Sequence, residues 1–310
     1  MAKVPSAEER FGPIRGSLTE AKRLADGLPD LLIEARRVAS IILAGWHGRR
    51  TSGRGETFWQ FRPFLPDDAR TDIDWRRSAR DSHLYVRETE WEAAHTVWLW
   101  VDLTASMGTR SRLAPTSKRD RGVVLLLALA ELLAAAGERV GLLGVSSPIL
   151  ARNAAERLAE FLAHMDAGRT EPDARALRRL SDVVLIGDFF DPIEEIEKTL
   201  EPIQRSGARA HLVQVVDPIE ETFPFSGRVE FRDPESGFTH VLDRTELHRG
   251  EYERLLAAHR ERLARTSRQL DWTFLVHRTD RPATDPLLAL HARLADRHGK
   301  TGTGAGGLAA

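Results

Sequence analysis

The chain has 310 residues, enough for one large domain or two modest ones with a full hydrophobic core. Its 45 basic and 46 acidic side chains leave a net charge of −1, so no overall positive charge draws it toward nucleic acid or an anionic membrane. The absence of cysteine excludes disulfides, thiolate nucleophiles and cysteine-ligated metals, and it is compatible with a reducing cytoplasm.

The opening residues place charges where a signal peptide needs an apolar core, so we expect no export signal and a cytoplasmic protein. Apolar residues recur at helical spacing from Leu18 to Trp46, which predicts one or two amphipathic helices in the segment 1–46. No apolar run approaches the roughly 20 residues that a membrane-spanning helix needs. We therefore predict no membrane span.

Residues 47–92 are rich in arginine, aspartate, glycine and aromatic side chains, which predicts loops and short strands that pack on the core of the rest of the chain. The acidic cluster here could form a second cation site, but the interspersed arginines favour internal ion pairing and nearly cancel its charge, which also argues against nucleic-acid binding. Its members are Asp67, Asp68, Asp72 and Asp74. We expect three tryptophans to act as core or interface anchors, namely Trp59, Trp75 and Trp91.

After residue 92 the pattern becomes regular, because apolar runs of strand length alternate with helical stretches. The predicted strands are Thr96–Val101, Val140–Val145, Asp182–Gly187, His211–Val216 and Trp272–Val276. The predicted helices are Arg121–Ala136, Ala154–Met165, Pro172–Leu180, Ile193–Ser206, Thr245–Gln269 and Pro286–Arg297. This alternation predicts one α/β domain over residues 93–298, with a doubly wound, mainly parallel sheet and helices on both faces.

Residues 217–244 interrupt the alternation and are predicted to form a β-hairpin insertion around the turn Asp233–Gly237. The final residues, 299–310, contain a glycine pattern that formally matches a nucleotide-binding loop. No helix can follow so close to the end of the sequence, so we interpret this segment as a disordered tail.

The first buried strand ends in Asp102-Leu-Thr-Ala-Ser106, at the edge where open α/β sheets place their ligands. Asp102, Thr104 and Ser106 are spaced by two and could present a carboxylate and two hydroxyls to one hard cation. The same residue types also cap turns and helices, and the pentapeptide alone does not decide between the two interpretations.

Two later loops are expected at the same edge of the sheet. Thr170 lies in a Gly-Arg-Thr loop, and Asp188 follows the strand Asp182–Gly187. Asp191 could support the same loop or cap the helix that begins after Pro192, and we favour capping. Three loops therefore converge on one predicted site.

This ordered set resembles the metal-ion-dependent adhesion site of von Willebrand factor A domains, with threonine in place of the usual serine at Thr104. The resemblance implies a von Willebrand factor A-like fold and a Mg²⁺ ion, or Mn²⁺ or Ca²⁺. It implies that the ion is held by Asp102, Thr104, Ser106, Thr170 and Asp188.

The segment before the first buried strand resembles the bacterial family called domain of unknown function 58. The matching residues are Arg62, Pro66, Asp68, Arg70, Ile73, Asp74, Trp75, Ala79, Arg80, Val86 and Arg87. Proteins of this family are commonly encoded beside AAA+ ATPases of the MoxR type, so the resemblance implies such an ATPase as a partner.

We therefore expect a non-enzymatic adaptor in which the cation recruits an acidic side chain of a protein partner. The alternative is a metal-dependent hydrolase that uses Asp102, Asp188 and one carboxylate between Asp67 and Asp74, although no HExxH or GxSxG motif supports it. A scaffold that binds no metal is a third interpretation.

Overall fold

The structure is a computed structural model that describes residues 14–46, 57–65, 73–80, 83–90, 95–165, 171–179 and 181–300. Its contacts divide the chain into two compact units, one formed by Met1–Gly48 with Thr96–Ala310 and the other by Arg49–His95. No helix among the described residues combines the length and the apolar character that crossing a bilayer requires. The predicted tail, 299–310, lies almost wholly outside these ranges.

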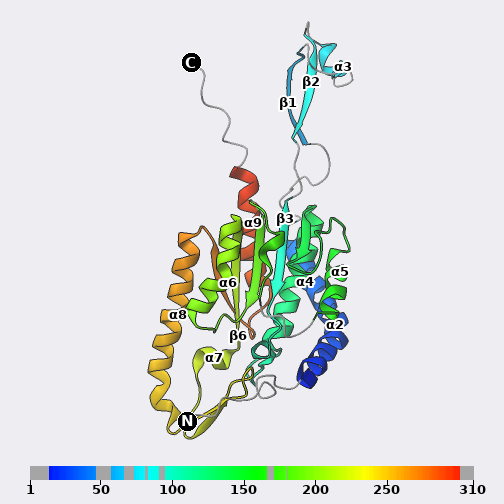
Figure 1. Ribbon diagram of the computed structural model, residues 1–310. Coiled ribbons are helices and arrows are strands. Elements are labelled where there is room, and N and C mark those ends of the chain that lie inside the picture. The colour runs from blue at the N-terminus through cyan, green and yellow to red at the C-terminus, as the bar shows by residue number, and fades with distance from the viewer. Residues whose placement is uncertain are drawn as a thin grey trace. The chain divides into compact units, whose positions relative to one another are not determined.

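The larger unit is built on a sheet of five parallel strands in the order β4-β3-β5-β6-β9 (Figure 1). The strands are β3 (Thr96–Val101), β4 (Arg139–Leu142), β5 (Asp182–Gly187), β6 (Arg209–Val216) and β9 (Thr273–Arg278). This confirms the predicted α/β fold. Because the chain goes from β3 to β4 on one side and then back across to β5, the sheet has its topological switch point between β3 and β5.

Helices cover both faces of the sheet, as predicted (Figure 1). On one face α4 (Lys118–Ala136), α5 (Ala154–Ala163) and α9 (Thr284–Lys300) pack on the sheet, and α2 (Ile14–Trp46) packs outside these helices. On the other face lie α6 (Ile193–Ser206) and α8 (Arg249–Gln269). Successive β3 side chains point into the hydrophobic cores on opposite faces of the sheet: Leu99 packs in the core on the α4 side and Trp98 in the core on the α6 side. Helix α4 is apolar on all sides because α2 and α5 cover the surface that the sheet leaves open.

The segment predicted as a helix over Pro172–Leu180 forms only the short 3₁₀ turn η3 (Ala174–Ala176), so that prediction was wrong. Asp173 accepts a hydrogen bond from the Arg175 amide, and the Ser181 hydroxyl accepts one from the Arg178 amide. These side chains satisfy amides that a helix would otherwise bond, and β5 begins too soon afterwards for a further turn.

Four shorter elements connect β6 to α8. They are α7 (Pro218–Thr222), the hairpin strands β7 (Val229–Arg232) and β8 (Thr239–Leu242), and the 3₁₀ helix η4 (Thr245–His248). Strands β7 and β8 pair antiparallel, which confirms the predicted hairpin insertion.

The smaller unit contains an antiparallel pair, β1 (Thr57–Pro63) and β2 (Tyr85–Glu90), with the single-turn helix α3 (Trp75–Ser78) between them. Asp74 caps α3 by accepting a hydrogen bond from the Arg77 amide, and the Arg77 guanidinium lies 4.9 Å from the centre of the Tyr85 ring. Trp75 is 64% exposed, so it is not a core residue. The Trp59 side chain and Trp91 lie outside the described residues, and the packing of this segment on the α/β body stays a prediction.

Candidate functional site

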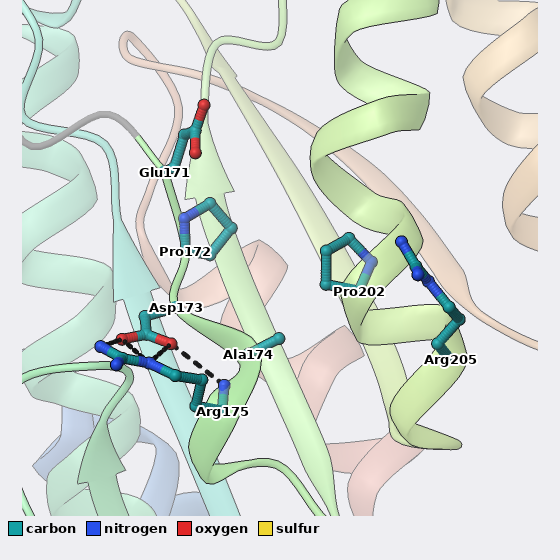
Figure 2. Close-up of a pocket in the computed structure, with 7 residues that line it drawn as sticks. All are labelled: Glu171, Pro172, Asp173, Ala174, Arg175, Pro202 and Arg205. Carbon is teal, nitrogen blue, oxygen red and sulfur yellow. Dashed lines mark hydrogen bonds and ion pairs between the residues drawn. The ribbon is translucent and has the colours of Figure 1, made fainter.

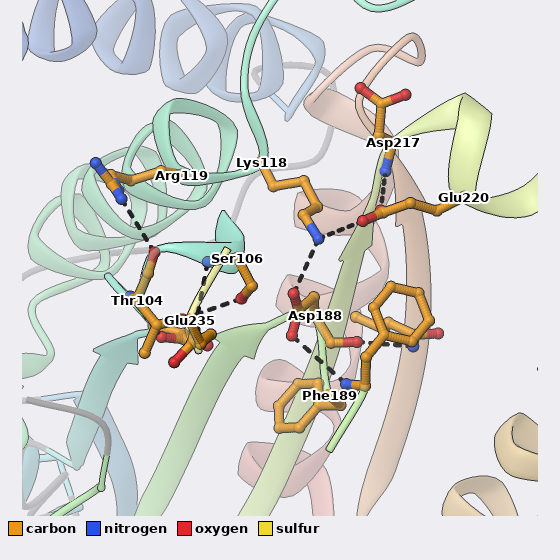
Figure 3. Close-up of polar contacts among 12 residues, drawn as sticks. Thr104, Ser106, Lys118, Arg119, Asp188, Phe189, Asp217, Glu220 and Glu235 are labelled. Carbon is orange, nitrogen blue, oxygen red and sulfur yellow. Dashed lines mark hydrogen bonds and ion pairs between the residues drawn. The ribbon is translucent and has the colours of Figure 1, made fainter. Parts of the chain in front are cut away.

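The loop after β3, residues 102–106 and called the Asp102 loop below, contains three of the predicted site residues, two of which, Thr104 and Ser106, are labelled in Figure 3. Asp102 accepts a hydrogen bond from the Thr104 amide, at 2.9 Å, and the hydroxyl oxygens of Thr104 and Ser106 lie 3.1 Å apart. Arg119, from the first turn of α4, donates to the Thr104 carbonyl at 3.0 Å and holds the loop in place. One carboxylate and two hydroxyls therefore share a small region at the carboxyl edge of the sheet.

Asp188 enters the same region from the neighbouring strand, because β5 lies beside β3 and ends at Gly187. The Asp102 amide donates to the Ile186 carbonyl, which ties the two strand ends together. A methyl group built on Gly187 would lie 3.3 Å from the Asp102 Cβ, so glycine lets the two loops approach closely. Asp102 and Asp188 thus lie at the ends of neighbouring strands at the switch point of the sheet, close enough to interact electrostatically.

The turn after Asp188 is held by contacts to β6 and α8. Phe189 has a φ of 49°, an uncommon conformation for a bulky residue. Its carbonyl bonds the His259 ring, and the Asp188 carbonyl accepts a 2.8 Å hydrogen bond from Gln214. A strained backbone that neighbouring elements hold in this way is typical of functional loops.

A buried lysine, which the sequence analysis did not single out, completes the cluster. Lys118 begins α4 and is 1% exposed, and its Nζ lies 2.9 Å from Asp188 Oδ2 and 2.6 Å from Glu220 Oε1. Burial alone would lower the pKa of Lys118, but the attraction of Asp188 and Glu220 outweighs it and raises the pKa. The lysine is therefore charged, and it neutralises one side of the Asp188 carboxylate.

Asp102 has no such partner among the described residues. Its burial raises its pKa to about 6, with hydrogen bonds from Thr104 acting against this, and the charges of Asp188 and Glu235 raise the pKa further. Burial, followed by Asp188 and Glu235, also raises the pKa of Asp191. The region therefore gathers more negative charge than Lys118 balances, which favours a bound cation.

The side chains that could bind an ion here are the carboxylates of Asp102 and Asp188 and the hydroxyls of Thr104 and Ser106, and such oxygen ligands suit a hard cation such as Mg²⁺. Among the described residues, no group of three or more His, Asp or Glu side chains is arranged to hold a metal ion by itself. Thr170, the fifth predicted ligand, lies outside the described residues. The residues present fit such a cation, with Lys118 competing for Asp188.

Asp191 does not cap α6, so that prediction was wrong. The N-cap position is occupied by Pro192, which makes no capping side-chain hydrogen bond. Asp191 instead lines a small cavity of about 180 Å³ beside the Asp102 loop, together with Trp100, Phe189 and Glu195.

A more open hollow of about 800 Å³ lies between the η3 segment and α6 (Figure 2). Arg175 pairs with Asp173 there, at 2.5 Å, and Pro202 and Arg205 form the opposite wall. Because its Arg175 side chain is 90% exposed and already paired, this hollow lacks the buried polar groups of the Asp102 region.

Two solved structures are distantly similar to this chain. The protein BatB from Bacteroides thetaiotaomicron is 13% identical, with a TM-score of 0.40 over 67% of this chain and 100% of that chain. An aerotolerance-related membrane protein from Bacteroides fragilis is also 13% identical, with a TM-score of 0.38 over 66% of this chain and 100% of that one. Matches this weak carry no argument about function.

Sequence relatives cover more of the chain. Proteins of Mycobacterium tuberculosis and Mycobacterium bovis, described as uncharacterized proteins Rv1480 and Mb1516, are each 28% identical over 90% of this chain and 92% of their own length. The model of the family described as protein of unknown function DUF58 matches residues 60–262, which span both the smaller unit and the Asp102 and Asp188 loops. The chain therefore belongs to the DUF58 family, as the resemblance of its residues 53–190 predicted.

Proposed function

We propose that the chain is a protein-binding adaptor that works without catalysis and uses a divalent cation at the switch point of its sheet. Asp102, Thr104 and Ser106 would hold the ion from one loop, and Asp188 would face it from the other. Thr170 is proposed as the further ligand from the resemblance to von Willebrand factor A domains. A bound Mg²⁺ supplies an outward coordination position that accepts a carboxylate of a partner.

The observation that supports this proposal most directly is a carboxylate without a basic partner among the described residues, lying beside two hydroxyl groups. Asp102 is partly buried and has no basic partner in the part of the chain that the structure describes, while the Thr104 and Ser106 oxygens lie 3.1 Å apart beside it. Hydroxyl ligands leave most of the ion's charge unbalanced, which favours an external anion over hydrolysis of a bound substrate. Lys118 keeps Asp188 oriented by holding one of its oxygens.

The partner proposed from the family resemblance is a AAA+ ATPase of the MoxR type, with the pair acting in the assembly or activation of other proteins. From the sequence pattern alone, we further propose that the adaptor works in the cytoplasm. The unbalanced oxygens of the Asp102 loop support one element of this proposal, because a cation bound there would attract an acidic side chain of the partner.

Calorimetry with Mn²⁺ and Mg²⁺ tests the cation site directly. We expect wild-type protein to bind one ion, and Ser106→Ala to bind it at least tenfold more weakly because a hydroxyl ligand is lost. Ser40→Ala is the matched control, since Ser40 is an exposed serine on α2 whose hydroxyl only bonds the Arg37 carbonyl. Absence of binding by wild type at millimolar ion would refute the cation site.

Affinity capture of a purified MoxR-type ATPase, with and without EDTA, tests the adaptor role. We expect chelation and Ser106→Ala to reduce capture to the same extent, and Ser40→Ala to leave it unchanged. Capture of the ATPase that is unchanged by EDTA and by Ser106→Ala would contradict the proposed contact. Turnover of a substrate that requires Mg²⁺ and disappears in Asp188→Ala would instead favour the hydrolase.

A further inference from the structure

The tip of the β7–β8 hairpin reaches the Asp102 loop. In the turn between the strands, Glu235 Oε1 accepts a hydrogen bond from the Ser106 amide at 3.3 Å (Figure 3). Glu235 also lies within electrostatic reach of Asp102 and Asp191. A carboxylate from an insertion more than a hundred residues away in sequence is thus placed against one of the proposed ligands.

The turn is built to present this carboxylate. Asp233 Oδ1 accepts a hydrogen bond from the Glu235 amide at 3.0 Å, and the Gly237 amide donates to the Asp233 carbonyl at 2.9 Å. Gly237 has a φ of 70°, which glycine adopts without strain. The conformation of the turn is therefore set by its own hydrogen bonds, and Glu235 projects from it toward Ser106.

The two ends of the hairpin are held to different degrees. Its strands are held, because Phe231, two residues before the turn, stacks on Phe223 with 5.8 Å between ring centres, and at the base the Thr245 hydroxyl donates to the Gly227 carbonyl. Its tip is exposed, with Phe238 71% accessible, and reaches the sheet edge through the Glu235 contact. A two-stranded hairpin is only marginally stable without such support, so its tip can leave while its base stays.

We propose that the hairpin is a displaceable internal ligand, in which Glu235 occupies the outer side of the Asp102 loop and an acidic side chain of a partner binds by taking its place. This rests on the proposed function, because it assigns the partner's carboxylate to the same loop. Glu235 carries the functional group that the cation would recruit, and it is already held at Ser106. The hairpin then makes binding selective for partners that compete with an intramolecular carboxylate.

Hydrogen exchange without added metal tests whether Glu235 seats the hairpin. We expect Glu235→Ala to speed amide exchange in residues 227–245 and at Ser106, because the contact that holds the tip is lost. Glu230→Ala is the matched control, since Glu230 is exposed on β7 of the same hairpin and its loss removes the same charge. Equal exchange in the two variants and in wild type would overturn the proposal.

Displacement itself is measured with a fluorescent peptide, Gly-Gly-Glu-Gly-Gly, in the presence of Mn²⁺, against its glutamine counterpart. If Glu235 occupies the Asp102 loop in about nine molecules of ten, only about one molecule in ten is free to bind the peptide, and the apparent affinity for the peptide falls roughly tenfold. Glu235→Ala should therefore bind the glutamate peptide about tenfold more tightly than wild type. Glu230→Ala should bind it as wild type does.

The two proposals fail in different ways. Wild-type protein that binds Mn²⁺ normally, with equal peptide affinity in Glu235→Ala, would overturn displacement and leave the cation site intact. Wild-type protein that binds no Mn²⁺ would overturn the cation site, and displacement of Glu235 at that ion would fail with it.

Discussion

Replacing Lys118 with methionine is the sharpest test of how the buried charges are balanced. The substitution keeps an unbranched side chain of similar length but removes the ammonium from between two carboxylates, at 2.9 Å and 2.6 Å. Breaking a buried ion pair from one side costs about 3–5 kcal/mol. The Glu220 side chain is 19% exposed and can turn toward water, whereas the Asp188 side chain is only 7% exposed. We therefore expect Lys118→Met to lower the free energy of unfolding by about 3 kcal/mol, mainly because the Asp188 carboxylate is left buried without a partner charge.

The measurement is urea unfolding followed by circular dichroism at pH 7 in EDTA, so that no added ion replaces the ammonium. Lys198→Met is the control, because Lys198 is exposed on α6 and should change stability by less than about 0.5 kcal/mol. Adding Asp188→Asn to Lys118→Met removes the unpaired charge and should recover part of the loss. A Lys118→Met loss below about 1 kcal/mol, or no recovery in the double variant, refutes this account.

Two further predictions concern stability. Burial, followed by the charge of Arg121, lowers the pKa of His277 from 6.5 to about 4. Between pH 6.5 and pH 4 the unfolded state therefore binds a proton that the folded state does not. Lowering the pH through this range should reduce the free energy of unfolding by roughly 3 kcal/mol. Urea unfolding at pH 7 and pH 4 should show a smaller loss in His277→Gln, and an equal loss contradicts this. Gly141→Ala places a methyl group 2.7 Å from the Trp98 ring and should destabilise the protein by about 1–3 kcal/mol. Gly250→Ala on α8 places its methyl group where nothing beyond its chain neighbours and the helix's own backbone lies within 4 Å, and it should stabilise the protein slightly. Thermal unfolding should therefore show a lower Tm for the first variant and a slightly higher Tm for the second.

The sequence predicted those parts of the fold that depend on burial alone. Strand β5 and helix α6 were predicted with their observed bounds, because an unbroken apolar run and a clear helical period each have a single interpretation. The segment Pro172–Leu180 was predicted wrongly, since its apolar spacing fits a helix while its Asp173 and Ser181 side chains bond the backbone instead. Local side-chain hydrogen bonds decide between a helix and a turn here, and the spacing of apolar residues carries no information about them.

The candidate site was predicted in the same partial way. The positions of Asp102 and Asp188 follow from strand ends, which parallel strands bring to one edge. Lys118 was missed because it precedes an apolar helix beside two arginines, where a charged residue is usually solvated, and only the fold shows it buried between carboxylates. Glu235 was identified as part of a turn, but no local pattern indicates where a hairpin tip lies in space.

The two missed residues lie on parts of the fold that differ in rigidity. Lys118 joins α4 to β5 and to α7, all of which pack in the body of the larger unit, and it is almost fully buried. Glu235 stands on an exposed hairpin whose tip has few contacts. Local opening requires far less free energy at the hairpin than in the core. A partner that engages the Asp102 loop is therefore expected to move the hairpin and leave the Lys118–Asp188 pair in place.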